Sequence, residues 1–70
     1  MSTSSKFDLD MLDAVFSDIL SAFQSCKDTL STSEQFYAQL WFDKMKEPQS
    51  NRTFKMLRNA QAMCLLDMCY

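Results

Sequence analysis

The three cysteine thiols are the side chains of this sequence best suited to nucleophilic or metal chemistry. The residues available around them favour neither nucleophilic catalysis nor metal binding. The chain contains Cys26, Cys64 and Cys69 and no histidine. A cysteine nucleophile therefore lacks its usual general base, and a Ser–His arrangement is impossible. No acidic residue lies in a stretch that would both bury it and supply a partner, the setting that tunes a carboxyl pKa for catalysis. We therefore expect a protein that is not an enzyme.

A metal site would need these thiols to converge. Cys64 and Cys69 are five residues apart, which on one helix separates them by about 140°. Cys26 and Asp67 would have to complete the set, whereas zinc sites use closer Cys or His pairs. The sequence thus predicts no metal site and no cofactor. We interpret Cys26 and Cys64 as small buried hydrophobic residues, and Cys69 as an outward-facing thiol that could react or form an interface.

A group of basic and amide side chains could instead bind nucleic acid. It lies at the start of the last predicted helix and consists of Asn51, Arg52, Lys55, Arg58 and Asn59. Arg and Asn read guanine and adenine edges, and a short connection before this helix would suit a helix-turn-helix. The connection has no glycine, the basic patch is small and the pI is about 4.7, all of which count against phosphate binding. A nucleic-acid-binding regulator is therefore the alternative function rather than the favoured one.

The elements that position these residues are predicted to be helices. The chain has 70 residues, 47% of them hydrophobic, with no glycine and Pro48 as its single proline. Sheet proteins need glycine in their turns, so the sequence predicts an all-α fold in a single domain, 1–70. Helices are expected at about 6–30, 33–46 and 52–69, and their short connections make neighbours antiparallel. The expected architecture is a small three-helix up-down-up bundle, which dimerisation could complete because so short a chain buries a limited core.

The first helix shows the clearest amphipathic pattern. Its apolar residues follow spacings of 4, 3, 4, 3 and 4, which is typical of a helix-packing seam. They are Leu12, Phe16, Ile19, Phe23, Cys26 and Leu30. After it, both Ser31 with Glu34 and Thr32 with Gln35 have the spacing of a capping box, which predicts the start of the second helix. Pro48 ends that helix, because the residue before proline avoids helical geometry, and Ser50 or Asn51 is expected to cap the third.

The middle helix carries the densest aromatic stretch of the chain, from Phe36 to Phe42, and its only tryptophan, Trp41. At 100° per residue its apolar arc covers about two-thirds of the circumference, wider than the ~100° stripe of a one-sided helix. We favour a central helix covered on two sides by the bundle. In the other interpretation, part of the apolar arc is exposed and binds another chain. The predicted core comprises Leu12, Phe16, Ile19, Phe23, Phe36, Leu40, Trp41, Leu57 and Cys64.

The third helix is predicted to pack through an apolar stripe and to end in an apolar tip. The inner stripe consists of Phe54, Leu57, Cys64, Leu65 and Met68. The outer face begins with the basic group and becomes apolar at Ala62, Leu66, Cys69 and Tyr70. A chain end is normally polar, so we expect this one to dock on its own bundle or on another molecule.

The surplus apolar surface favours protein–protein interaction as the function. We expect a small regulator, adaptor or inhibitor that binds a surface of a larger protein, with homodimerisation as the simplest use of the surface. Interface anchors are typically Trp, Tyr and Arg. The expected anchors are Tyr37, Trp41, Arg58, Leu66 and Tyr70.

The sequence also predicts a compartment. No apolar run approaches the ~20 residues of a membrane span, and the N-terminal residues lack the apolar core of a signal peptide. An odd number of cysteines argues against a disulfide framework and for reduced thiols. We therefore expect no membrane partner and a location in the cytoplasm or the nucleus.

Overall fold

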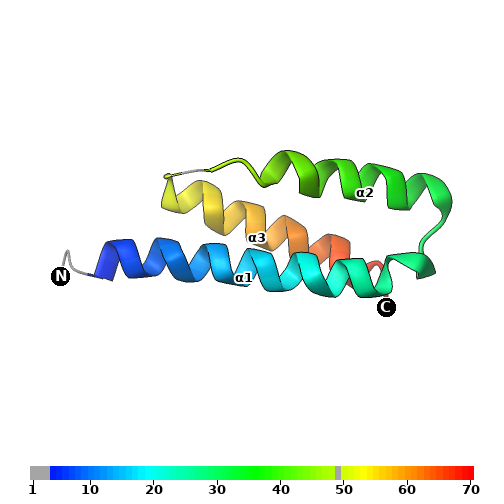
Figure 1. Cartoon of the computed structure of the whole chain (residues 1–70), viewed down its shortest axis with the longest axis horizontal. Coiled ribbons are helices and arrows are strands. Elements are labelled where there is room, and N and C mark those ends of the chain that lie inside the picture. The colour runs from blue at the N-terminus through cyan, green and yellow to red at the C-terminus, as the bar shows by residue number, and fades with distance from the viewer. Residues whose placement is uncertain (1–3, 49) are drawn as a thin grey trace.

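Over its described residues, the chain folds into three α-helices that run up, down and up, as predicted (Figure 1). The computed structural model describes residues 4–48 and 50–70, the first four of these by their backbone alone. Helix α1 spans Ser4–Cys26, α2 spans Thr32–Met45 and α3 spans Arg52–Asp67. A 3₁₀ turn, η1 (Lys27–Thr29), lies between α1 and α2. The all-α fold class is confirmed.

The α-helical part of the first helix ends at Cys26 rather than near residue 30. The Thr29 hydroxyl donates a hydrogen bond to the Cys26 carbonyl at 2.9 Å, and the Leu30 N–H donates to the Lys27 carbonyl at 2.9 Å. Helix ends often tighten in this way, because their last carbonyls lack partners within the helix. Leu30 then adopts an extended backbone (φ −88°, ψ 157°) with its side chain buried, so the chain turns back toward α2.

Two side-chain caps determine where α2 and α3 begin. The Glu34 N–H donates to the Ser31 hydroxyl at 3.3 Å, and the Ser31 N–H donates to a Glu34 carboxylate oxygen at 3.1 Å. This is the predicted capping box, which satisfies two backbone donors reciprocally. The Phe54 N–H donates to the Asn51 side-chain oxygen at 2.8 Å. Of the two caps considered for α3, Asn51 is therefore the one used.

An aromatic cluster joins α2 to α1. The Phe42 ring of α2 lies 4.8 Å from the Phe23 ring and 5.8 Å from the Phe16 ring of α1, measured between centroids. Phe23 and Phe42 are fully buried, Phe16 and Ile19 are buried, and Trp41 covers the cluster from one side as a half-buried residue. Burial of each large apolar side chain contributes roughly 1.5–3 kcal/mol, so these rings hold α2 in place.

The central position predicted for the middle helix is wrong. Helices α1 and α3 pack most closely with each other, so α2 lies against their pair and is covered on one side. Its buried residues are Ala38 and Phe42, whereas Phe36 and Leu40, both predicted to be core, are exposed. The wide apolar arc of α2 therefore reaches solvent.

The orientation predicted for the third helix is also wrong, because α3 is rotated about its axis. Leu57 and Cys64 were predicted to be core, but Leu57 is 67% exposed and Cys64 is exposed. The inward face consists instead of Lys55, Arg58, Asn59, Ala62, Leu66 and Cys69. The small side chain of Ala62, fully buried, permits the close approach of α3 to α1, and the polar residues find partners on α1.

Candidate protein-interaction surface

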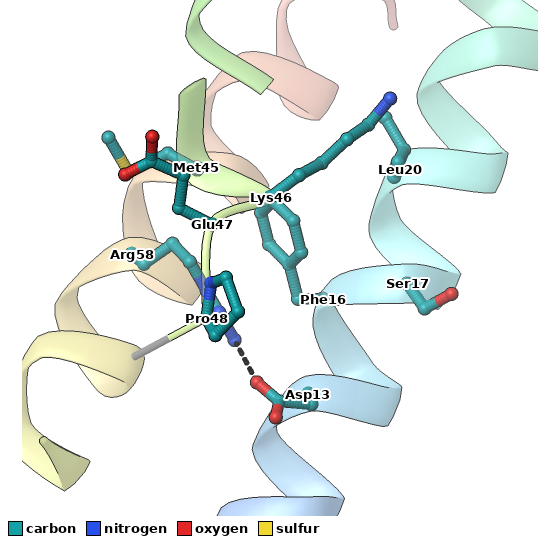
Figure 2. A pocket seen from close by; sticks show the side chains of 9 residues that line it. All are labelled: Asp13, Phe16, Ser17, Leu20, Met45, Lys46, Glu47, Pro48 and Arg58. Carbon is teal, nitrogen blue, oxygen red and sulfur yellow. Dashed lines mark hydrogen bonds and ion pairs between the residues drawn. The ribbon is translucent and has the colours of Figure 1, made fainter. Parts of the chain in front are cut away.

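The polar residues of α3 are held inward by a single carboxylate of α1. The Lys55 ammonium lies 2.6 Å from one Asp13 carboxylate oxygen, and the Arg58 guanidinium lies 3.3 Å from the other. Both cationic side chains are buried, while that of Asp13 is half exposed. Figure 2 shows the pair of Arg58 and Asp13 bridging the two helices. The hydrogen bond from Lys55 is the main cause that lowers the pKa of Asp13, so the carboxylate stays ionised.

Arg58 and Asn59 complete this network through the backbone of α1. The Arg58 guanidinium and the Asn59 amide both donate to the Leu12 carbonyl, at 3.2 and 2.9 Å. The Arg58 Nε–H donates to the Asn59 side-chain oxygen at 3.0 Å, and its guanidinium carbon lies 4.2 Å from the centre of the Phe16 ring. In the described part of the chain, no buried side-chain nitrogen or oxygen lacks a partner. These charges are used for helix packing.

This burial argues against the nucleic-acid alternative. Lys55, Arg58 and Asn59 face α1 and cannot reach a base edge. Arg52 is exposed but lies 3.6 Å from Asp8, and the side chain of Asn51 caps α3. The structure thus brings the five residues onto one helix without placing them on one accessible face.

A cavity of about 350 Å³ lies between α1, α3 and the connection that follows α2 (Figure 2). Its charged inner wall is formed by Asp13 and Arg58, which bind each other. The remaining lining residues are Phe16, Ser17, Leu20, Met45, Lys46, Glu47 and Pro48. Because the two inner charges neutralise each other, we do not regard this cavity as the functional site.

A second hollow is apolar and lies between α2 and α3; we call it the α2–α3 groove. It has a volume of about 210 Å³. Its lining consists of Glu34, Tyr37, Ala38 and Trp41 from α2 and Gln61, Leu65 and Met68 from α3. Ala38 has a small side chain between larger ones, so the space between the two neighbouring helices is not filled at this position.

Exposed apolar side chains flank this groove. Leu40 is exposed on α2, and Leu57 and Cys64 are exposed on α3. Leu40 is three residues from Tyr37, and Leu57 is four from Gln61, so each lies on the same side of its helix as a groove residue. We call the whole surface the α2–α3 face. It comprises the groove residues with Leu40, Leu57 and Cys64.

The predicted anchor residues have different fates. Tyr37 and Trp41 line the groove together, as exposed and half-buried side chains. Tyr70 is 87% exposed next to the C-terminal turn. Leu66 and Arg58 were expected at the surface, but both are buried against the bundle. The prediction that Leu66 and Arg58 are exposed anchors is wrong, because the side of α3 that carries them faces α1.

Sequence reasoning missed Phe36, Leu57 and Met68 as surface residues. A signal was present in the seam of α3, where the spacings 4, 3, 4 and 3 connect Lys55, Asn59, Ala62, Leu66 and Cys69. That seam matches the heptad spacing of α1, but its first two members are polar. Polar residues can be buried at the start of a seam only if another residue pairs with them. Asp13, beside the α1 seam, pairs with Lys55.

Cys64 and Cys69 occupy environments opposite to those predicted, whereas Cys26 packs against the core, near its predicted setting. Cys69 is buried, Cys64 is exposed and Cys26 is half-buried. Burial is the main cause that raises the pKa of the Cys69 thiol to about 11, so at neutral pH Cys69 is almost entirely in its protonated form. Among the described residues, no group of three or more His, Cys, Asp or Glu side chains lies close enough to hold a metal ion.

Comparisons with known proteins leave this surface as the main guide to function. No protein-family model, curated protein or solved structure matches the chain. Among the helices described, none combines the length and the apolar character needed to cross a membrane.

Proposed function

We propose that this chain is a non-catalytic protein-interaction module, a small regulator, adaptor or inhibitor that binds a protein partner through the α2–α3 face. One observation carries the proposal: α3 buries Lys55 and Arg58 and exposes Leu57 to water. Contiguous exposed apolar surface is unfavourable for an isolated soluble domain and commonly marks an interaction site. The rotation of α3 is stabilised by the ionic network with Asp13, so the apolar face is a consequence of specific contacts.

The groove has the shape that suits a helix from the partner. From Glu34 to Trp41 it extends along two turns of α2, or roughly 10 Å. An amphipathic helix places apolar side chains at intervals of three and four residues, which can enter a groove between two helices. Tyr37 and Trp41 supply aromatic area beside the hollow, and aromatic residues dominate the energetics of interfaces.

The simplest occupant is a second copy of this chain. Two-fold pairs are the commonest assemblies, and in them one surface binds itself. The α2–α3 face has Glu34 as the sole charged residue of its groove, so two copies would bring few like charges together. A reducing compartment, cytoplasm or nucleus, is consistent with three free thiols.

A matched pair of substitutions tests the proposal. Met68 lines the groove and is 51% exposed, while Met11 on α1 is 49% exposed and lies outside the face. We expect light scattering to show self-association that increases with concentration and is lost in Met68→Asp. Met11→Asp should associate like the unmodified chain, because it adds the same charge elsewhere.

Two results would count against this function, one against self-association and the other against the α2–α3 face as the binding surface. A chain that stays monomeric to about millimolar concentration, where binding is worth only about 4 kcal/mol, excludes the second copy as occupant. Equal binding of Met68→Asp and Met11→Asp to a partner protein purified from the native host excludes the α2–α3 face as the binding surface. Circular dichroism of both variants must show unchanged helicity for either comparison to hold.

A further inference from the structure

The last turn of the first helix and the end of the chain are joined at Thr29. Its hydroxyl is a shared donor to two carbonyl oxygens, that of Cys26 at 2.9 Å and that of Cys69 at 3.0 Å. The two oxygens therefore lie no more than about 6 Å apart. The Cys69 N–H also donates to the Leu66 carbonyl at 3.0 Å, which keeps Cys69 in the helical turn that ends α3.

The side chains of the two cysteines meet at the same place. Cys69 is 7% exposed and belongs to the buried core, and Cys26 packs against that core as a half-buried residue. Burial first, and then the neighbouring Cys26 side chain, raise the pKa of the Cys69 thiol. Cys64 is exposed on another side of α3. The structure therefore selects one pair from the three cysteines.

We propose that Cys26 and Cys69 are a redox-modification site, at which a reversible disulfide joins the end of α1 to the end of α3. A disulfide needs Cα atoms about 4.4–6.8 Å apart and side chains directed at each other. The Thr29 hydroxyl binds both backbones, and both side chains lie at the same core cluster, so the two cysteines are placed near each other. The third thiol, Cys64, stays reduced.

The oxidant is a low-molecular-weight disulfide, such as glutathione disulfide. Cys26 is the more accessible thiol of the pair; as thiolate it attacks one sulfur of glutathione disulfide and releases one glutathione thiolate. Cys69 then loses its proton to solvent and attacks the Cys26 sulfur, which breaks the mixed disulfide and releases the second glutathione. Two protein thiols are oxidised and one glutathione disulfide is reduced to two glutathione molecules.

The disulfide should stabilise the fold strongly, because it closes a loop over most of the chain. Cross-linking residues this far apart in sequence removes much of the conformational freedom of the unfolded state. For a domain of this size we expect the Tm to rise by at least about 10 °C on oxidation. Dithiothreitol should return the Tm to its original value.

The test uses the full chain with Cys64→Ala, which removes the competing thiol at an exposed position. After equilibration with reduced and oxidised glutathione, we expect a monomer that has lost two hydrogens, contains no free thiol and has the higher Tm. Cys26→Ala in the same background is the control and should keep the lower Tm. In the unmodified chain, cleavage at Met68 by cyanogen bromide separates Cys64 from Cys69, so the paired cysteine can be identified by mass.

Two outcomes would overturn the proposal. The first is a glutathione adduct on Cys26 that persists in folded Cys64→Ala without forming the internal disulfide. The second is a disulfide that, in the unmodified chain, joins Cys26 to Cys64 rather than to Cys69. Either result would mean that the ends of α1 and α3 are not held together at Thr29.

Discussion

Replacement of Asp13 by alanine is the most direct test of the orientation of α3. The carboxylate accepts hydrogen bonds from the Lys55 ammonium and the Arg58 guanidinium, both of which are buried. Asp13→Ala therefore leaves two cations facing α1 without their counter-ion. By contrast, Asp18 is exposed on the same helix and makes no ion pair within the described residues. Asp18→Ala is thus the matched control.

The expected loss of stability follows from the contacts. A hydrogen bond to a charged group is worth about 1.5–3 kcal/mol, and breaking a fully buried ion pair costs about 3–5 kcal/mol. The Asp13 side chain is 51% exposed, so solvent screens the interaction and the lower part of this range applies. We expect Asp13→Ala to lower the free energy of unfolding by about 2–3 kcal/mol. A domain of this length has only about 3.5–10 kcal/mol in total.

Urea unfolding followed by circular dichroism measures this loss. With a slope of about 1 kcal/mol per molar urea for so small a domain, the urea midpoint should fall by about 2–3 M. Asp18→Ala should change the free energy of unfolding by less than about 0.5 kcal/mol. Adding Lys55→Met and Arg58→Met to Asp13→Ala should recover most of the loss, since apolar residues of similar size avoid the desolvation of stranded charges.

Equal effects of Asp13→Ala and Asp18→Ala would refute this reasoning. They would mean that Lys55 and Arg58 point to solvent, and that α3 packs through Phe54, Leu57 and Cys64 as its apolar spacing suggested. The α2–α3 face would then lose its exposed residues on α3. The proposed function depends on the same orientation, so this experiment precedes any search for a partner.

Further predictions concern burial and titration. Leu66→Asp should lower the free energy of unfolding by more than about 3 kcal/mol, because it buries an unpaired charge, while Leu57→Asp should cost less than about 1 kcal/mol; urea titration distinguishes them. A thiol reagent at neutral pH should modify Cys64 rapidly and Cys69 only after unfolding, as mass spectrometry of time points can show. The pKa of Asp13 is lowered from 3.8, so its contribution to stability is present above about pH 4 and is lost as the pH falls further; Asp13→Asn should flatten this acid limb. The pKa of Cys69 is raised from 9.0 to about 11, so the contribution of this thiol to stability should be fully present below about pH 9 and be lost toward pH 11; Cys69→Ala should remove this decrease.

Local signals in the sequence were sufficient to predict the three helices and where α2 and α3 begin, but not where α1 ends. The heptad spacing of Phe16, Ile19 and Phe23 placed all three in the core, where they are found. The capping box at Ser31 and the cap at Asn51 are formed as expected. Such signals depend on spacing and on bonds within a few residues, so they do not require knowledge of the neighbouring helix.

The candidate site was predicted in part. Tyr37 and Trp41 were expected at an interface and do line the α2–α3 groove. Arg58 and Leu66 were misplaced because α3 is rotated. Both faces of α3 carry enough apolar residues to form a buried stripe. Composition therefore could not predict which of the two faces is buried.

The sequence by itself determined that the described chain is helical, where its helices begin, and which side of α1 faces inward. Only the tertiary structure decided which side of α3 is buried. The physical reason is that a buried cation is unfavourable alone and acceptable beside a carboxylate. Lys55 and Arg58 find that carboxylate on Asp13, more than forty residues away in sequence. A contact at that separation decides which residues of α3 stay exposed, and with them the surface available for binding.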